Sequence, residues 1–236
     1  MADKFEYAKT EPGAGVGRVY EDDLNKNYRW ALNEGGLHFE KESKVQKAMY
    51  KIAKRLNDLH IDYAVVGGMA LFHHGFRRFT EDVDILVNKQ DVRIIHDKLE
   101  GAGYRPPYAN SKNLRDTEFG VRIEFLIAGE FPGDGKPKPV SFPSPADVSE
   151  IGEGVSYINL KSVVELKLAS GMTNISRISD IGDVAKLIRI AKVPRTLADE
   201  LDPYVRDKYL ELWDGVAMDP VRHEDATFND EEAGSE

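Results

Sequence analysis

The stretch Val65-Val66-Gly67-Gly68, followed after thirteen residues by Asp82-Val83-Asp84-Ile85, decides how this chain folds. Tyr63 to Val66 reads as a short buried strand. The glycine pair at its end permits a tight turn and a close approach of the backbone to a ligand. Asp82 and Asp84 alternate with aliphatic residues, which predicts a strand over residues 82–87. Both carboxylates would then point to the same face.

Two carboxylates on one face are suited to a divalent cation. Mg²⁺ prefers oxygen ligands and often shares them with substrate phosphates, and Mn²⁺ accepts similar ligands. A two-metal site usually needs more than two carboxylates. Glu124, in the apolar run Val121-Arg122-Ile123-Glu124-Phe125, is the third candidate. An unpaired charge in such a run would be costly to bury, so we expect Glu124 to face a cleft or a cation. Asp116 and Glu118 are nearby alternatives.

The segment between the glycines and the acids is suited to a phosphate. Residues 69–74 read as a short helix ending at Gly75, and a helix N-terminus presents free N–H groups. Arg77 or Arg78 could neutralise a triphosphate, and Arg78 could equally be a surface cation. Thr80 could contact the ligand or cap the turn before Glu81.

At these residues the chain resembles the nucleotidyltransferase superfamily of the DNA polymerase β type. That family's pattern is an apolar residue, Gly-Gly or Gly-Ser, a gap of about a dozen residues, Asp-x-Asp, and a later acid. Here those places are taken by Val66, Gly67, Gly68, Asp82, Asp84 and Glu124.

A finer resemblance is to the AbiEii-like nucleotidyltransferases, which include toxins of toxin–antitoxin systems. Their Gly-Gly-x-Ala-x-x-x-x-Gly-x-x-Arg-x-Thr-x-Asp-x-Asp pattern is matched by Gly67, Gly68, Ala70, Gly75, Arg78, Thr80, Asp82 and Asp84. Their later Lys, Arg and paired Asp are matched, less specifically, by Lys167, Arg177, Asp180 and Asp183. The alternative for Asp180 and Asp183 is a surface ion-pair ladder that Lys186 continues, and the alternative for Lys167 is a solvated helix face.

The resemblance implies an α+β (mixed α/β) fold: a small mixed β-sheet core flanked by helices, followed by a helical C-terminal part. It implies transfer of a nucleoside monophosphate from a nucleoside triphosphate, such as ATP, to a hydroxyl of a small molecule, protein or RNA. Asp82, Asp84 and Glu124 would be the catalytic metal ligands for Mg²⁺ or Mn²⁺. The nucleotide contacts would be Gly67, Gly68, Arg78, Thr80, Lys167, Asp180 and Asp183. A toxin role would add an antitoxin partner.

Two other classes remain open. One is a nucleotide-binding or interaction protein of the same fold without turnover. The other is a glycosyltransferase that holds its metal with an Asp-x-Asp pair, against which the preceding glycine pair argues.

Composition sets modest bounds. The 236 residues contain no cysteine, which excludes disulfides and thiolate metal sites. The sequence shows no long apolar run and no signal-peptide pattern, so we expect a cytoplasmic protein without a membrane partner. The net charge is −9, but six of the 41 acids lie in Glu224–Glu236. The other 35 acids face 32 bases, a net charge of −3, which indicates no global preference for nucleic acid.

Four regions are expected: an N-terminal arm over 1–42, a catalytic core over 43–160, a helical part over 161–218 and a disordered acidic tail over 219–236. Ser43, with Gln46, predicts a capping box that opens a helix to about Asn57. Further elements are expected as a helix over 90–101, a hairpin over 117–127, a strand over 155–159, and helices over 161–170, 178–191 and 197–216. Gly171 and Pro203 are expected to end the first and disturb the last of these helices.

Overall fold

This computed structural model describes residues 19–218, which divide into two compact units. The first comprises residues 19–73, 77–128 and 143–158, and the second comprises residues 74–76, 129–142 and 159–218. The first contains the sheet and the second contains helices, so the predicted mixed α/β class with a helical C-terminal part is confirmed. Residues 1–18 of the expected N-terminal arm and the acidic tail at 219–236 lie outside the described residues.

The first unit alternates helices with short strands. Its helices are α1 (Tyr20–Lys26), α2 (Tyr28–Phe39), α3 (Lys44–Asp58), α4 (Gly67–His73), α5 (Lys89–Leu99) and α6 (Pro145–Val148). Its strands are β1 (Tyr63–Val65), β2 (Asp82–Val87), β3 (Tyr104–Arg105), β4 (Leu114–Asp116), β5 (Arg122–Ile127), β6 (Ser149–Gly152) and β7 (Val155–Ile158).

The strands form one mixed sheet in the order β3-β4-β5-β2-β1-β7-β6. β2 runs parallel to β5 and β1 runs parallel to β7, whereas the other pairs are antiparallel. The register of β2 and β5 places Asp82 beside Arg122 and Asp84 beside Glu124. The two predicted acid-bearing strands are therefore neighbours in the sheet.

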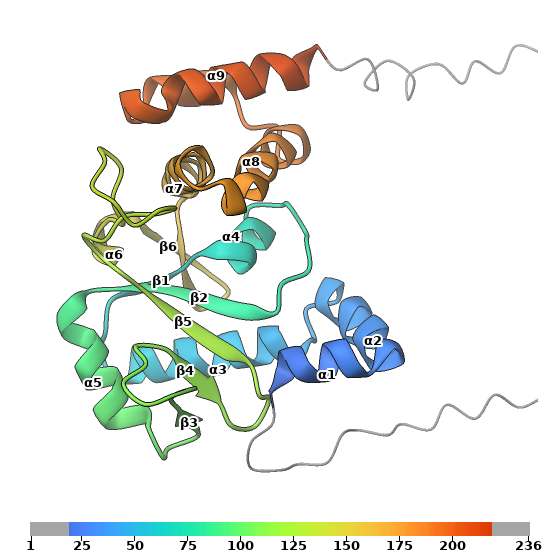
Figure 1. Cartoon of the computed structure of the whole chain (residues 1–236), viewed down its shortest axis with the longest axis vertical. Coiled ribbons are helices and arrows are strands. Elements are labelled where there is room, and N and C mark those ends of the chain that lie inside the picture. Colours follow the sequence, from blue (N-terminus) through green and yellow to red (C-terminus); the bar gives the residue numbers. More distant parts are fainter. Residues whose placement is uncertain (1–18, 219–236) are drawn as a thin grey trace, which may run out of the picture. The chain divides into compact units, whose positions relative to one another are not determined.

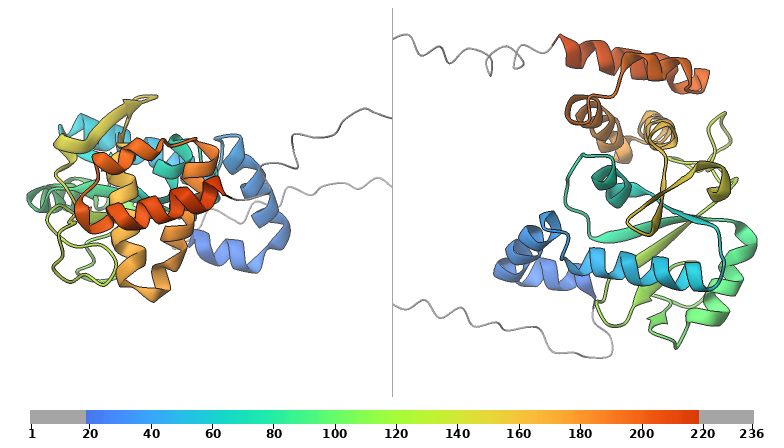
Figure 2. Two further views of the ribbon diagram at one scale, coloured as in Figure 1. Left: turned by 90° about the horizontal axis from the view of Figure 1, so that it is seen from above. Right: turned by 180° about the vertical axis from the view of Figure 1, so that it is seen from behind.

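Alternation along β2 separates the core from the acids. Val83, Ile85 and Val87 are buried in a cluster with α3 and α5, whereas Asp82 and Asp84 point to the other face. Figures 1 and 2 show α3 running along one face of the sheet, and Figure 1 shows α4 on the opposite face. The acids therefore lie on the same face of the sheet as α4, the helix that begins at the glycine pair.

Several local predictions are confirmed. Ser43 caps α3, and its side chain and that of Gln46 form the expected capping box. The hairpin over 117–127 has its second strand at β5 with Glu124, but its first strand, β4, ends before the turn, at Asp116. The strand expected over 155–159 is β7.

The structure also contains elements that the sequence analysis did not name. Helices α1 and α2 lie within the region expected as an arm, and Tyr20 is fully buried, with its hydroxyl donating to the buried Glu34 at 3.1 Å. The short strands β3 and β6 also went unpredicted. Their brevity explains this, because two to four residues carry too little periodicity to be recognised.

The second unit is mainly helical. Its elements are α7 (Leu160–Thr173), η1 (Ile175–Arg177), α8 (Ile178–Ile190), η2 (Arg195–Asp199) and α9 (Pro203–Ala217). The left view of Figure 2 shows α9 crossing over α7 and α8. Pro203 opens α9 at the first helical turn, where a missing N–H costs nothing.

The expected end of α7 at Gly171 is wrong, because the helix continues to Thr173. The glycine instead serves close packing. A Cβ at Gly171 would lie 2.6 Å from Cγ1 of Ile181, so the absence of a side chain allows α8 to approach. Within residues 19–218, no helix has the length and apolar character needed to cross a membrane.

Candidate active site

Asp82, Asp84 and Glu124 converge on one face of the sheet. The first two lie on β2 and the third lies on the parallel neighbour β5, directly beside Asp84. One carboxylate oxygen from each lies within 4.8 Å of the others, and all three residues are half-buried. The alternatives Asp116 and Glu118 lie elsewhere: both pair with Lys51, at 2.8 and 2.9 Å, and Asp116 also accepts two backbone N–H bonds in the β4–β5 turn.

Gly67 brings the strand end of β1 against this cluster. Its φ of +58° lies in the left-handed region, and a Cβ there would overlap Oδ2 of Asp84. The backbone N–H of Val66 donates to the carbonyl of Asp84 at 2.9 Å. Glycine is therefore required at position 67 for two reasons: the left-handed backbone conformation and the close approach to Asp84.

Thr80 and Gly68 support Asp82. The Thr80 hydroxyl donates to Oδ1 of Asp82 at 3.0 Å, and Thr80 is buried. A Cβ at Gly68 would lie 2.7 Å from Cβ of Thr80 and 2.8 Å from its Oγ1. This bond to the acid pair is a third role for Thr80, besides the ligand contact and the turn cap considered from the sequence.

Arg122 lies among the acids. Its two terminal nitrogens are 2.9 Å from Oδ2 of Asp82 and 2.9 Å from Oε1 of Glu124. Its Nε is 3.8 Å from Oε1 of Glu21, on α1. Partial burial works against the charge of Arg122, but the hydrogen bond to Asp82 and the nearby acids outweigh it and raise the pKa of Arg122 further.

Glu21 belongs to the same charge network. It accepts from Arg115 at 2.7 Å and 3.3 Å. Burial, Glu21 and Asp82 together raise the pKa of Glu81 above its usual value, against the opposing effect of Arg122. The carboxylates therefore create a negative potential that favours cations.

Arg78 lies in the segment that connects α4 to β2. Its backbone carbonyl accepts from Nε2 of His38 at 3.0 Å, and its side chain is half-buried. His38 itself is fully buried and also contacts the Ser43 hydroxyl at 3.3 Å. Helix α2 thus anchors the connection that leads to Thr80 and Asp82.

The residues present fit a divalent cation. Three carboxylates offer hard oxygen donors within reach of one ion, and the missing Cβ of Gly67 leaves Asp84 uncrowded. This set of donors suits Mg²⁺ or Mn²⁺ better than a thiolate-seeking metal.

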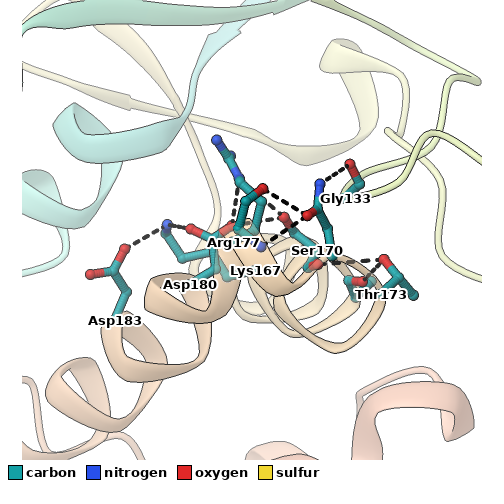
Figure 3. Close-up of polar contacts among 10 residues, drawn as sticks. Gly133, Lys167, Ser170, Thr173, Arg177, Asp180 and Asp183 are labelled. Carbon is teal, nitrogen blue, oxygen red and sulfur yellow. Dashed lines mark hydrogen bonds and ion pairs between the residues drawn. The ribbon is translucent and has the colours of Figure 1, made fainter.

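Lys167, Asp180 and Asp183 form a separate buried cluster in the second unit (Figure 3). The ammonium of Lys167 is 2.8 Å from Oδ1 of Asp180 and 2.8 Å from Oδ2 of Asp183. Ser170 and Arg177 donate to Asp180 at 2.7 and 3.1 Å. A nucleotide contact by these residues stays a prediction, but the ion pairs are buried rather than a solvated ladder.

These pairings decide the charge state of Asp180. Burial disfavours its carboxylate, but Lys167, Ser170 and Arg177 outweigh burial and lower the pKa of Asp180. The cluster thus carries mutually compensating charges within α7, η1 and α8, and its role in holding these helices together needs no ligand.

Two residues of the acid cluster were not predicted from the sequence. An arginine two residues from an acid on a strand resembles a surface cation. The spacing that places Glu124 on the acid face also places Arg122 there, so the signal was present. Glu21 could not be found, because its contact spans 101 positions in the sequence to Arg122.

The solved structures similar to this chain include two nucleotidyltransferase-like proteins. No protein-family model and no curated protein matches the chain. An antigenic nucleotidyltransferase-like protein from Paracoccidioides brasiliensis is 16% identical, with a TM-score of 0.41, over 61% of this chain and 75% of that one. A proposed nucleotidyltransferase from H. pylori is 16% identical, with a TM-score of 0.43, over 85% of this chain and 99% of that one.

Proposed function

We propose that this protein is a nucleotidyltransferase that moves a nucleoside monophosphate from a nucleoside triphosphate to a hydroxyl acceptor. The observation that carries the proposal is the convergence of Asp82, Asp84 and Glu124 within 4.8 Å, beside a glycine whose absent side chain leaves room for Asp84. Acids from adjacent strands next to an open backbone turn suit a charged phosphate ester together with a cation.

Asp82, Asp84 and Glu124 would hold Mg²⁺ or Mn²⁺ through carboxylate oxygens. The bound ion would supply positive charge to the triphosphate oxygens. Gly67 and Gly68, at the start of α4, would cradle the phosphates, and Arg78 and Thr80 lie on the segment that leads to Asp82. Thr80 would act through its bond to Asp82.

In the proposed reaction the acceptor oxygen forms a bond to the α-phosphorus. The bond from the α-phosphorus to the oxygen bridging to the β-phosphate breaks, and pyrophosphate leaves. The acceptor's proton passes to a carboxylate of the cluster or to water. Because pyrophosphate is already a good leaving group, positioning and charge neutralisation supply most of the catalysis.

The acceptor is proposed as a hydroxyl of a small molecule, protein or RNA. The AbiEii-like spacing of Gly67, Ala70, Gly75 and Arg78 is the support for a toxin role with an antitoxin partner. That role rests on the motif resemblance alone.

A second candidate is a nucleotide-binding protein of this fold without turnover. Arg122 favours it, because its two ion pairs satisfy Asp82 and Glu124 without any metal. The two candidates agree on nucleotide binding and differ on product formation.

Thermal unfolding tests the binding common to both. We expect each effective NTP with Mg²⁺ to raise the melting temperature by about 5–10 °C at a hundredfold excess over its dissociation constant. Asp84→Asn, which keeps the shape of the side chain, should abolish the shift. Protection by a sugar nucleotide but not by any NTP would support the glycosyltransferase class, and no protection by any nucleotide would contradict the proposal.

A further inference from the structure

We infer that Arg122 is an internal counterion of the acid cluster, which a divalent cation must displace, and that Glu21 on α1 receives the displaced guanidinium. The inference rests on the proposed function, because it concerns the same acids. It assigns Arg122 and Glu21 as positioning residues that set the affinity for the metal.

The first step is that Arg122 occupies the oxygens a metal would need. Oδ2 of Asp82 accepts from one terminal nitrogen of Arg122, and Oδ1 accepts from Thr80. Oε1 of Glu124 is 2.9 Å from the other terminal nitrogen. Both oxygens of Asp82 therefore have a donor, and a metal ligated by Asp82 and Glu124 competes with the guanidinium.

The second step is that the position of Arg122 is built into the sheet. Arg122 is the register partner of Asp82, and it lies two residues before Glu124 on the same strand. Its planar guanidinium presents several donors in a fixed fork, so it can bridge two carboxylates from different strands. This holds the like-charged acids together when no metal compensates them.

The third step is that the guanidinium has a second partner nearby. Nε of Arg122 is buried and makes no hydrogen bond within residues 19–218, yet it lies 3.8 Å from Oε1 of Glu21. In the inferred metal-bound state the guanidinium leaves Asp82 and turns to Glu21, which would give Nε an acceptor. Glu21 is itself held by Arg115 at 2.7 Å, so the receiving carboxylate is already fixed.

Two consequences follow. The ion pairs of Arg122 must break when the metal binds, which makes the free energy of metal binding less favourable. The site is therefore half-occupied at a higher metal concentration than it would be without Arg122. Because Glu21 lies in the first turn of α1, metal occupancy also becomes linked to the contacts of that helix.

Mn²⁺ titration of the full chain, followed by electron paramagnetic resonance of the free ion, tests the competition. Arg122→Gln should bind Mn²⁺ about tenfold more tightly than the wild type, because the hydrogen bond to Asp82 and the ion pair with Glu124 no longer need to break. Glu21→Gln should bind Mn²⁺ several-fold more weakly, because the displaced guanidinium loses its receiver. Arg93→Gln, which removes one charge from an exposed site on α5, should change nothing.

Removing a charge alone could also strengthen metal binding, so a direct view of Arg122 is needed. The ¹⁵Nε–¹H resonance of Arg122, assigned by its loss in Arg122→Gln, should shift on addition of diamagnetic Mg²⁺ in the wild type. The shift should be absent in Glu21→Gln.

The outcomes separate this inference from the proposed function. If the wild type binds Mn²⁺, Asp84→Asn does not, and Arg122→Gln binds no more tightly, the metal site stands and the inference is overturned. Tighter binding without movement of the Arg122 resonance also overturns it, because only the field of the charge would then act. If the wild type itself binds no Mn²⁺, both the inference and the proposed function fail.

Discussion

Gly67 lies so close to Asp84 that a Cβ on the glycine would overlap the carboxylate oxygen Oδ2. The two residues come from different elements: Gly67 begins α4 just after β1, and Asp84 lies within β2. The glycine therefore serves the acid as well as the turn. This contact joins the two halves of the sequence motif into one site.

Gly67→Ala should remove divalent metal binding while leaving the chain folded. The new methyl group must push the Asp84 carboxylate away, and φ of +58° adds backbone strain of roughly 1–2 kcal/mol. Mn²⁺ titration measures the first effect and urea unfolding measures the second.

Gly101→Ala is the matched control. Gly101 has φ of +76°, but nothing lies within 4 Å of the added Cβ. It should show a similar strain and normal metal binding. Equal metal binding by Gly67→Ala and the wild type would refute the role of the close approach.

Thr80→Val should weaken metal binding several-fold without a large loss of stability. Valine keeps the shape of threonine but removes the 3.0 Å bond that orients Asp82. A hydrogen bond to a charged group contributes about 1.5–3 kcal/mol of free energy when it is buried. The contribution is smaller here because the Asp82 side chain is partly exposed. Isothermal titration with Mn²⁺ checks this, and unchanged affinity would show that Thr80 only caps the turn.

Lys167→Met should destabilise the protein by about 3–5 kcal/mol, because it leaves Asp180 and Asp183 buried without their shared cation. Urea unfolding measures the loss. Replacing both acids as well, in Lys167→Met/Asp180→Leu/Asp183→Leu, should restore most of it, since buried ion pairs can often be exchanged for apolar packing.

The same variant tests the nucleotide contact predicted from the resemblance. If Lys167 binds phosphate and contributes little to folding, Lys167→Met should keep the wild-type unfolding free energy within about 0.5 kcal/mol. It should then lose the thermal protection given by Mg²⁺ with NTP. That pattern would overturn the structural assignment of the cluster.

His38 should make stability depend on pH. Burial lowers its pKa from the usual 6.5, outweighing the hydrogen bond to the Arg78 carbonyl. Below pH 6.5 the unfolded chain therefore binds a proton that the folded chain resists. The stability that His38 contributes is complete above pH 6.5 and is lost as the pH falls toward the lowered value.

His38→Gln is the control for this dependence, because its amide nitrogen can replace Nε2 without titrating. The measurement is the unfolding free energy between pH 7.5 and 5.5 for both proteins. The wild type should lose more stability than His38→Gln over this range, and parallel curves would contradict the assignment.

The sequence was sufficient for the centre of the fold because local rules and tertiary packing agree there. Val83 and Ile85 alternate with Asp82 and Asp84, so a single strand assignment determines both the core face and the acid face. The capping residues Ser43 and Gln46 likewise define the start of α3 without help from other segments.

The sequence was insufficient where the role of a residue is set by contact with a residue far away in the chain. Gly171 resembles a helix end, yet packing against Ile181 makes it an interior position. Glu21 becomes a site residue only through its contact with Arg122, 101 positions away in the sequence. Lys167 resembles a solvent-facing cation until two aspartates from another helix surround it.

Label transfer tests the central claim most directly. The purified chain is incubated with Mg²⁺, a cell extract and each NTP labelled at either the α- or the γ-phosphate, and protein, RNA and small-molecule fractions are separated. The account predicts transfer of the α-label but not the γ-label, and its loss in Asp84→Asn. Equal labelling by Asp84→Asn, or transfer of the γ-label, would contradict nucleotidyl transfer by these acids. Absence of any product despite Mg²⁺-dependent NTP binding would favour the nucleotide-binding role without turnover.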